Sequence, residues 1–380
     1  MILGIDASNI RDGGGVTHLY ELLRSADPAA VGVDRVVLWA SRALLKRIED
    51  RGWLLKQPDP SLEGGLAARL RWQKSRLAGL AAQQGCDVLF VPGGSDASGF
   101  RPLVSMSQNL LPFEWREFRR YGLSRLGVKY AVLRWTQART FRRAAAVIFL
   151  SGYARDAVLR VTGPLPGATP VIPHGIDPRF FHPPRPPRTG FTDANPCRIL
   201  YVSKIDVYKH QWHVVDAVAK LRASGLPAVL DLIGPPEHGS GRLAAALRHH
   251  DPAGQFVSCR GEVPYETLQD EYAKADISVF ASSCETFGQI LTEAMSAGLP
   301  IACSNRSAMP EILGDAGVYF DPESPTEIAE AIQTLIENPV LREAMARAAH
   351  DRAQRYSWDR CAKETFSLLA RIATAGRPGP

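Results

Sequence analysis

Two glutamates, Glu285 and Glu293, are separated by seven residues in the stretch ETFGQILTEAMSAGLPIACSN. A carboxylate accepts paired hydrogen bonds from vicinal hydroxyls. One glutamate for each sugar ring, with a phosphate-binding helix start between them, would therefore match a nucleotide sugar, with the ribose on Glu293 and the second sugar on Glu285. The simpler interpretation makes Glu293 a surface charge on a helix. The elements that carry the two residues decide between these interpretations.

The surrounding pattern predicts a strand, a loop and a helix. The run DISVFASS is typical of a buried parallel strand that enters a loop. Helical apolar spacing extends from Gln289 to Ala297, and Gly298 and Pro300 end that helix. Glu285 then lies on a strand-to-helix loop, where helix N-termini bind anions in α/β sheets. The backbone amides expected to face a diphosphate belong to Phe287, Gly288, Gln289 and Ile290.

Two lysines follow another predicted strand. In ILYVSKIDVYKH the strand ends at Val202, and Lys204 and Lys209 come on the loop before a helix. Cations at this position suit a diphosphate, because the charge of the leaving group grows as its bond to carbon breaks. The alternative is a pair of solvated loop lysines.

A glycine-rich turn near the N-terminus is a third candidate. In IDASNIRDGGGVTHLYELL a strand leads through Gly13, Gly14 and Gly15 into a helix. Glycines let the backbone approach a ligand and direct its amides at a phosphate. The stretch contains neither the GxGxxG pattern nor a Walker loop, so it is weak evidence when taken alone.

Composition indicates an ordinary soluble globular protein of 380 residues, with 45% apolar and 22% charged residues. A cytoplasmic protein is expected, because Asp6 interrupts the apolar core that a signal peptide needs and no apolar run is long enough to span a membrane. The six cysteines form no CxxC or Cys/His cluster, so neither a zinc site nor a disulfide framework is expected. The net charge of +6 favours a polyanionic or membrane-surface partner.

The segment from Glu114 to Arg143 concentrates this charge. It has nine Lys or Arg against two Glu, interleaved with aromatic residues. Such a mixture suits a surface that lies against anionic lipid headgroups, and we expect the contact at Trp115 to Arg143. No RNP, KH or zinc-knuckle pattern accompanies it, so nucleic acid is not an expected partner. A solvated helix face with its aromatic residues in the core is the alternative.

The chain alternates predicted strands and helices, which is typical of parallel α/β sheets. We expect an N-terminal Rossmann-like domain at 1–183, a Pro-rich linker at 184–196, a C-terminal Rossmann-like domain at 197–356, and a crossover helix with a tail at 357–380. The predicted strands are Ile2 to Ile5, Arg35 to Trp39, Val88 to Val91, Leu103 to Ser107, Ala146 to Leu150, Pro170 to Ile172, Arg198 to Val202, Val229 to Ile233, Phe256 to Ser258, Ile277 to Phe280, Ile301 to Cys303 and Val318 to Phe320.

Several ordered motifs resemble one family. ETFGQILTEAMSAGLP is similar to the EX7E signature of retaining GT-B glycosyltransferases of family 4, whose usual form is E-x-F-G-x-x-x-x-E-A-M-A-x-G-x-P. The resemblance extends over nearly the whole chain, through GGGVTHLYELL, AAAVIFLSGYARDAVL, VIPHGID, YVSKIDVYKH and YSWDRCAKE. It implies an α/β fold of two doubly wound domains that face each other across a cleft, with a C-terminal helix that returns to the first domain.

The resemblance also implies roles for the candidate residues. Lys204 and Lys209 would stabilise the departing nucleoside diphosphate, Glu293 would hold the ribose, and Glu285 would position the donor sugar. It implies a front-face reaction with retention, in which the leaving phosphate oxygen helps to deprotonate the acceptor. No cofactor or metal is expected, because the lysines supply the cations. The donor base would be held near Val263, largely through backbone groups.

Two positions depart from the family pattern. Ser203 and Lys204 replace the usual Gly-Arg, which exchanges a bidentate fork for a point charge. Gln108 and Asn109 stand where many members have a His-Asp pair, so hydrogen bonds to acceptor hydroxyls are expected there instead of proton transfer. His18 and His174 are the remaining candidates near the crevice, with His174 assigned to the acceptor site; a structural role is the alternative for both.

The favoured hypothesis is a hexosyltransferase that uses a nucleotide diphosphate sugar, such as GDP-mannose or a UDP-linked hexose. It would act at the inner face of the cytoplasmic membrane on a glycan or lipid-linked glycan in surface polysaccharide or lipopolysaccharide biosynthesis. A non-catalytic nucleotide-sugar or glycan-binding protein on the same fold is the alternative. A nicotinamide oxidoreductase is disfavoured, because GxGxxG is absent and the strand after the first helix does not end in an acidic residue.

Overall fold

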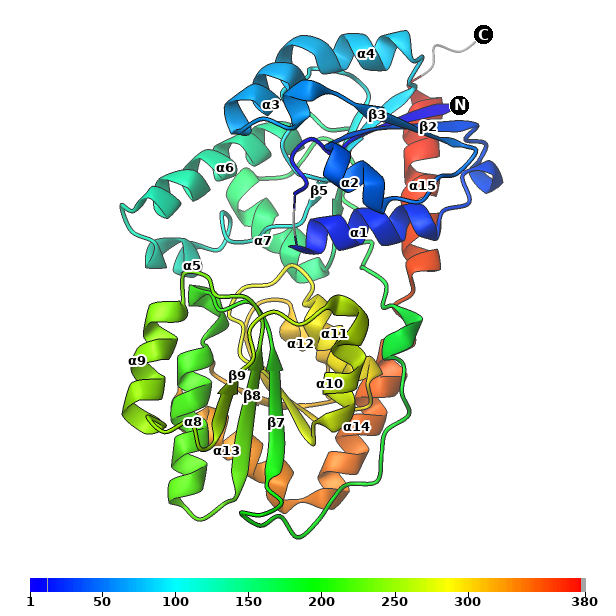
Figure 1. The fold of residues 1–380 in the computed structure, drawn as a ribbon. Coiled ribbons are helices and arrows are strands. Elements are labelled where there is room, and N and C mark those ends of the chain that lie inside the picture. The colour runs from blue at the N-terminus through cyan, green and yellow to red at the C-terminus, as the bar shows by residue number, and fades with distance from the viewer. Residues whose placement is uncertain (12, 377–380) are drawn as a thin grey trace. The chain divides into compact units, whose positions relative to one another are not determined.

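The computed structural model describes residues 1–11 and 13–376 (Figure 1). Two compact units are present, and each is described by itself. The N-terminal unit contains Met1–Gly175 and the chain from Tyr356 onward, and the C-terminal unit contains Ile176–Arg355. This division falls earlier than the domain boundary predicted at 183, so residues 176–183 and the predicted linker at 184–196 belong to the C-terminal unit.

The sheet of the N-terminal unit is fully parallel, in the order β3-β2-β1-β4-β5-β6. Its central strands are apolar runs buried on both faces, as parallel sheets require. The strands are β1 (Ile2–Asp6), β2 (Arg35–Ala40), β3 (Leu54–Pro58), β4 (Val88–Val91), β5 (Leu103–Ser107) and β6 (Ala146–Phe149).

Two strand predictions in this unit need correction. β3 was not predicted, because this half-exposed edge strand has neither a continuous apolar run nor an alternating pattern, and it ends in Pro58. The predicted strand from Pro170 to Ile172 is, within the described residues, an isolated bridge between Val171 and Phe149. Its proline removes one ladder donor, so the pairing does not extend.

The helices of the N-terminal unit include the predicted crossover helix. That helix, α15, belongs to the N-terminal unit and packs against α1 and β4, which confirms the prediction. α1 begins at Gly13, so the three glycines form its first turn and not a preceding turn. The elements are α1 (Gly13–Arg24), η1 (Ala29–Val31), α2 (Arg42–Arg47), η2 (Pro60–Leu62), α3 (Leu66–Trp72), η3 (Gln73–Leu77), α4 (Ala78–Gln83), α5 (Trp115–Arg120), α6 (Arg125–Phe141), α7 (Gly152–Thr162) and α15 (Trp358–Ala375).

The sheet of the C-terminal unit is also parallel, in the order β12-β11-β10-β7-β8-β9. All of its predicted strands are present: β7 (Cys197–Val202), β8 (Ala228–Ile233), β9 (Val257–Cys259), β10 (Ile277–Phe280), β11 (Ile301–Ser304) and β12 (Val318–Phe320). In both units the strand order reverses beside the first strand. The crevice between β7 and β10 is therefore the position where an open α/β sheet binds ligands.

Helices cover both faces of this second sheet. On one face α8 packs against both α9 and α13, and on the other face α11 packs against α14 (Figure 1). The elements are η4 (Pro178–Phe180), η5 (Val207–Lys209), α8 (Gln211–Ala223), α9 (Ser240–His250), η6 (Tyr265–Thr267), α10 (Leu268–Lys274), α11 (Gln289–Ser296), α12 (Met309–Leu313), α13 (Pro325–Glu337) and α14 (Pro339–Ala353).

The proline-rich segment at 184–196 lies on the C-terminal unit instead of forming a free linker. The guanidinium of Arg185 donates to the carbonyl of Ala275 over 2.6 Å, and Arg188 lies 3.1 Å from Asp276. The guanidinium groups of Arg188 and Arg342 both lie over the ring of Phe191, each 5.2 Å from its centroid. Arginines in a proline-rich run can fix the segment in this way because they donate to carbonyls at strand ends.

Gly234 allows the loops after β7 and β8 to approach closely. Its φ is +144°, and a Cβ atom there would lie 2.2 Å from the carbonyl oxygen of Ser203. The amide of Ser203 donates to the carbonyl of Ile233, which joins the ends of β7 and β8, and the amide of Gly234 donates to the carbonyl of Gly261 after β9. Any side chain at this position would push the β7 loop away from the sheet edge.

We therefore expect Gly234→Ala to lower the free energy of unfolding by about 2–4 kcal/mol, through steric overlap with the Ser203 carbonyl. The matched control is Gly241→Ala in the first turn of α9, where a Cβ atom would meet no heavy atom of the described residues within 4 Å. That variant should gain about 0.5 kcal/mol from helix propensity. Chemical denaturation of both variants measures the difference, and equal stabilities would contradict the close approach.

Candidate active site

The loops after β7 and β10 bring predicted site residues together at the switch point of the C-terminal sheet. The ammonium of Lys209 forms an ion pair with Oε1 of Glu285, and the Ser282 hydroxyl donates to the same oxygen over 2.7 Å. The side chains of Lys209 and Glu285 are only 7% and 17% exposed. Residues from two distant loops thus form one largely buried charged contact.

Both partners of this ion pair are fixed by neighbouring groups. The hydroxyl of Tyr201 donates to the carbonyl of Lys209 over 2.6 Å, and the lysine ammonium lies 5.0 Å from the ring centroid of Tyr208. The backbone amide of Glu285 donates to the hydroxyl oxygen of Ser307 over 2.9 Å. Hydrogen bonds to the backbone therefore fix the positions of both residues of the ion pair.

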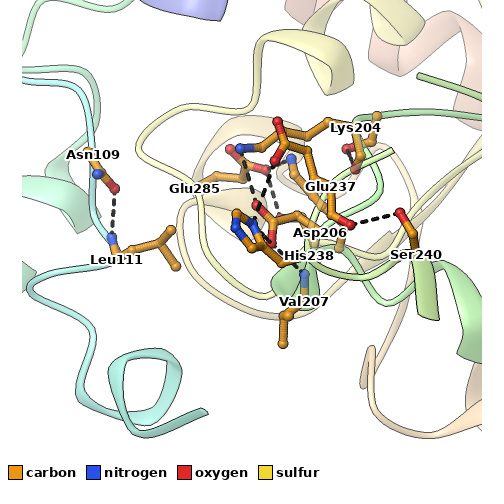
Figure 2. A network of polar contacts seen from close by, with 12 residues as sticks. Asn109, Leu111, Lys204, Asp206, Val207, Glu237, His238, Ser240 and Glu285 are labelled. Atoms are coloured by element: carbon orange, nitrogen blue, oxygen red, sulfur yellow. Dashed lines mark hydrogen bonds and ion pairs between the residues drawn. The ribbon is translucent and has the colours of Figure 1, made fainter. Parts of the chain in front are cut away.

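Lys204 has a more exposed position on the same loop (Figure 2). Its ammonium lies 3.2 Å from Oδ2 of Asp206, and its side chain is 43% exposed. Asp206 is buried, accepts a hydrogen bond from the amide of Val207 over 2.7 Å, and lies 3.7 Å from Nδ1 of His238. Ser203 donates to the Lys204 carbonyl over 3.1 Å. Lys204 therefore keeps a cation at the edge of the sheet that an anion can reach.

The start of α11 lies at the same edge. Gly288 is its N-cap with φ at +88°, and a Cβ atom there would lie 2.9 Å from the terminal carbon of Met309. Phe287 is buried, whereas Gln289 and Ile290 are half-buried. The helix N-terminus that was predicted to receive a diphosphate thus follows Glu285 directly. Val263, predicted near the donor base, is half-buried on the loop between β9 and η6.

Glu293 is buried within the C-terminal unit. Its exposed fraction is 1%, so the interpretation as a surface charge is wrong. The hydroxyl of Tyr265 donates to Oε1 over 3.1 Å, and that of Tyr272 donates to Oε2 over 3.2 Å. Burial raises the pKa of Glu293 to about 8, against the lowering effect of the two hydroxyls and of Arg179. A polar residue at this depth needs hydrogen-bond donors.

The predicted acceptor residues lie in the N-terminal unit. Gln108 donates to the carbonyl of Pro92 over 3.3 Å, and its Oε1 would lie 3.6 Å from a Cβ atom on Gly15. Asn109 accepts a hydrogen bond from the amide of Leu111 over 3.1 Å (Figure 2). A Cβ atom on Gly14 would meet no heavy atom of the described residues within 4 Å. Gln108 and the glycine turn are therefore neighbours.

His18 and His174 form a buried stack in the N-terminal unit. Their ring centroids are 4.7 Å apart, and the ring of Trp358 lies 5.4 Å from that of His174. His18 is fully buried, and His174 is 7% exposed. Desolvation, with a contribution from the neighbouring His174, lowers the pKa of His18 well below its ordinary value. The stack ties α1 to α15, and the assignment of His174 to the acceptor site stays a prediction.

Several residues around the candidate site were not found from the sequence. Ser282, Asp206, Tyr265 and Tyr272 contact the predicted charges from turns and from neighbouring elements. Of these four, only Asp206 carried a local signal in the sequence. An aspartate directly before a short helix can cap that helix. Among residues 1–11 and 13–376, no group of three or more His, Cys, Asp or Glu side chains is placed to hold a metal ion.

Family models match both units of the chain. Residues 12–180 match the model described as Glycosyltransferase Family 4, and residues 189–352 match the model described as Glycosyl transferases group 1. The chain belongs to the family 4 glycosyltransferases. The second match covers both lysines and both glutamates of the candidate site.

Curated relatives agree with this family. The chain is 31% identical over 254 residues to a GDP-mannose-dependent alpha-(1-6)-phosphatidylinositol dimannoside mannosyltransferase of Mycobacterium tuberculosis. That match covers 64% of this chain and 62% of the relative, so the family 4 chain spans less than two thirds of that relative's length. It is also 36% identical over 112 residues to an O-antigen chain mannosyltransferase B of Escherichia coli, covering 30% of this chain and 29% of the relative.

The fold of the family 4 chain matches a solved structure over its whole length. A sucrose-phosphate synthase from Thermosynechococcus elongatus superimposes with a TM-score of 0.80 at 18% identity, covering 99% of this chain and 100% of that one. At this identity the likeness informs on the fold alone. Together with the two parallel sheets, it confirms the predicted GT-B fold class.

Replacing Glu293 with Gln should change how stability depends on pH. In the folded protein the pKa of Glu293 is raised from 4.5 to about 8, so the protonated acid is favoured. Its contribution to stability is full below pH 4.5 and is lost as the pH rises through about 8. We expect Glu293→Gln to be close to the wild type in stability at pH 5 and to exceed its unfolding free energy at pH 9 by about 4 kcal/mol. Chemical denaturation at both pH values measures the two unfolding free energies. An equal decrease in the wild type and the variant between pH 5 and pH 9 would contradict the prediction.

Proposed function

We propose that this chain is a retaining hexosyltransferase that uses a nucleotide diphosphate sugar. The observation that carries the proposal is the contact of Lys209 with Glu285 at the switch point of the C-terminal sheet, beside the N-terminus of α11. A cation for the diphosphate, a carboxylate for sugar hydroxyls and a helix N-terminus for phosphate oxygens are the groups that bind such a donor.

In the proposed reaction the charged side chains act on the leaving group. The bond between the anomeric carbon and the diphosphate oxygen breaks, and the acceptor oxygen bonds to the same face of that carbon. The acceptor proton goes to the departing phosphate oxygen, so atoms and charge balance without a protein nucleophile. Lys204 and Lys209 neutralise the charge that develops on the diphosphate. Because these cations can fill that role, we propose that the reaction needs no metal.

The two glutamates hold the two sugar rings of the donor in this proposal. Glu285 accepts hydrogen bonds from the transferred hexose, and Glu293 accepts them from the ribose. The base lies near Val263. Gln108, Asn109 and His174 are proposed to hydrogen-bond the acceptor, with Gly14 and Gly15 close to a phosphate. Ser203 keeps the lysine loop in place through its hydrogen bond to the Lys204 carbonyl.

The donor is proposed to be GDP-mannose or a UDP-linked hexose, and the acceptor a glycan of a surface polysaccharide or lipopolysaccharide, linked to lipid. Two relatives support mannose, since both are described as mannosyltransferases and one as GDP-mannose-dependent. The alternative, a non-catalytic nucleotide-sugar or glycan-binding protein, differs in one respect. It would bind a nucleotide without turnover.

A lipid-linked acceptor agrees with the surface of α5 and α6. Val128, Val132 and Trp135 lie along one side of α6 and are 59%, 56% and 64% exposed, and Trp115 on α5 is 58% exposed. These side chains are interleaved with the basic residues of the Trp115 to Arg143 segment. We propose that this segment lies on the inner face of the cytoplasmic membrane. No helix in the described part of the chain is long and apolar enough to cross a bilayer.

Lys209→Met should slow hexose transfer roughly a hundredfold or more, because the cation stabilises the leaving diphosphate. The matched control is Lys220→Met on the exposed last turn of α8, which should retain the wild-type rate. Turnover is measured with GDP-mannose and UDP-hexoses, after titration with UDP, GDP and ADP with and without chelator. If the wild-type protein binds none of these nucleotides, the proposal is refuted. If it binds a nucleotide but shows no turnover, the non-catalytic alternative is favoured.

The membrane contact predicts binding to anionic vesicles. The wild type should sediment with phosphatidylglycerol-containing vesicles, and the double variant Trp115→Ala/Trp135→Ala should lose about tenfold or more of that binding. The control is Leu66→Ala/Leu70→Ala on α3, which removes exposed apolar side chains outside the segment. Equal losses in both double variants, or no binding by the wild type, would count against the contact.

A further inference from the structure

Tyr265 covers the carboxylate that the proposed function assigns to the ribose. Its hydroxyl donates to Oε1 of Glu293 over 3.1 Å, and the glutamate is 1% exposed with this contact in place. A ribose hydroxyl must reach one of the same two oxygens. The ligand-free arrangement therefore has a protein hydroxyl where the ligand hydroxyl is expected.

The two tyrosines on Glu293 differ in how firmly they are held. Tyr272 belongs to α10, is 1% exposed, and its hydroxyl also lies 3.5 Å from the carbonyl of Ile290. Tyr265 lies half-buried in the three-residue element η6, whose N-cap makes no side-chain hydrogen bond. Displacement of Tyr265 thus disturbs a short surface turn, whereas displacement of Tyr272 would disturb a packed helix.

The ring of Tyr265 packs against two side chains of η4. The guanidinium of Arg179 lies 4.1 Å from its ring centroid, and the ring of Phe180 lies 5.5 Å away. Both residues are in or beside η4, within the same compact unit as Glu293. These contacts define one docked position for the phenol of a half-buried residue.

A buried carboxyl also needs a donor at every stage of binding. Desolvation raises the pKa of Glu293, which shows how costly an unpaired charge would be there. Phenol and ribose hydroxyls can each donate to a carboxyl oxygen of Glu293, whether the acid is protonated or ionised. If a ribose hydroxyl replaces the phenol, the carboxyl of Glu293 keeps a hydrogen-bond donor. If the phenol left and no ligand hydroxyl replaced it, the carboxyl would lose that donor.

We propose that Tyr265 is a latch that occupies the ribose position on Glu293 and is displaced by the vicinal diol of a nucleoside diphosphate. The proposal rests on the function proposed above, because it takes Glu293 as the ribose-binding group. The latch lowers nucleotide affinity, since binding must first break the contact between tyrosine and glutamate.

The test is calorimetric titration with whichever of UDP, GDP and ADP the wild type binds. Tyr265→Phe should tighten the dissociation constant about five- to tenfold, which is the effect of removing one competing hydrogen bond. Tyr272→Phe is the matched control. It removes the hydroxyl that is expected to stay on Glu293 in the complex, so it should leave the affinity unchanged or weaken it.

A double-mutant cycle separates the latch from a general loosening of the loop. The gain from Tyr265→Phe should vanish in the Glu293→Ala background, because no contact is then left to remove. Persistence of the gain in that background would overturn the latch. Unchanged or weaker nucleotide binding by the single variant Tyr265→Phe would also overturn the latch. Weaker binding would show that the phenol supports the bound nucleotide.

Two further measurements complete the experiment. If Tyr265→Phe does not fold, Arg179→Met should also tighten binding by loosening the ring, and unaltered affinity there would overturn the latch. Failure of the wild type to bind any of the three diphosphates refutes the proposed function itself. If the wild type binds a diphosphate but Tyr265→Phe does not bind it more tightly, the latch is refuted and the proposed function is not.

Discussion

The buried ion pair between Lys209 and Glu285 is the constraint on which the candidate site depends. Two charges at 7% and 17% exposure need each other, because an unpaired charge at that depth would carry a large desolvation cost. The pair joins the loops after β7 and β10, which the strand order places on either side of the switch point. Gly234 lets the β7 loop lie close to the sheet, and Tyr201 fixes the backbone of Lys209. Sheet topology, loop packing and charge pairing therefore define one position.

The two glutamates of the EX7E-like stretch have opposite environments. Glu285 faces a lysine and a serine hydroxyl, whereas Glu293 faces two phenols and no cation in direct contact among the described residues. Because burial desolvates Glu293, which is held by neutral donors, its pKa is raised. The helix between them places one carboxyl at the sheet edge and buries the other, so a single short motif yields two chemically different groups.

Much of this arrangement could be predicted from the sequence, for identifiable reasons. Parallel strands buried on both faces are continuous apolar runs, which is why every strand of the second sheet was found, whereas the edge strand β3, with its polar Lys56 and Gln57, was not. The spacing of Glu285 and Glu293 gave the loop and the helix. It could not give burial, because Tyr265 and Tyr272 reach Glu293 from outside the motif. The proline-rich segment at 184–196 reads as a linker for the same reason, since its arginines are fixed by carbonyls distant in sequence.

The two units use one topology with different charge at the ligand-binding edge. In the C-terminal unit the loops after the first and fourth strands carry Lys204, Lys209 and Glu285. In the N-terminal unit Asp6 ends the first strand, where burial raises its pKa and Gln73 donates to it. A cationic edge suits a diphosphate, because hydrogen bonds between lysine and phosphate oxygens are charge-assisted. The two sheet edges therefore differ through their side chains and not through their topology.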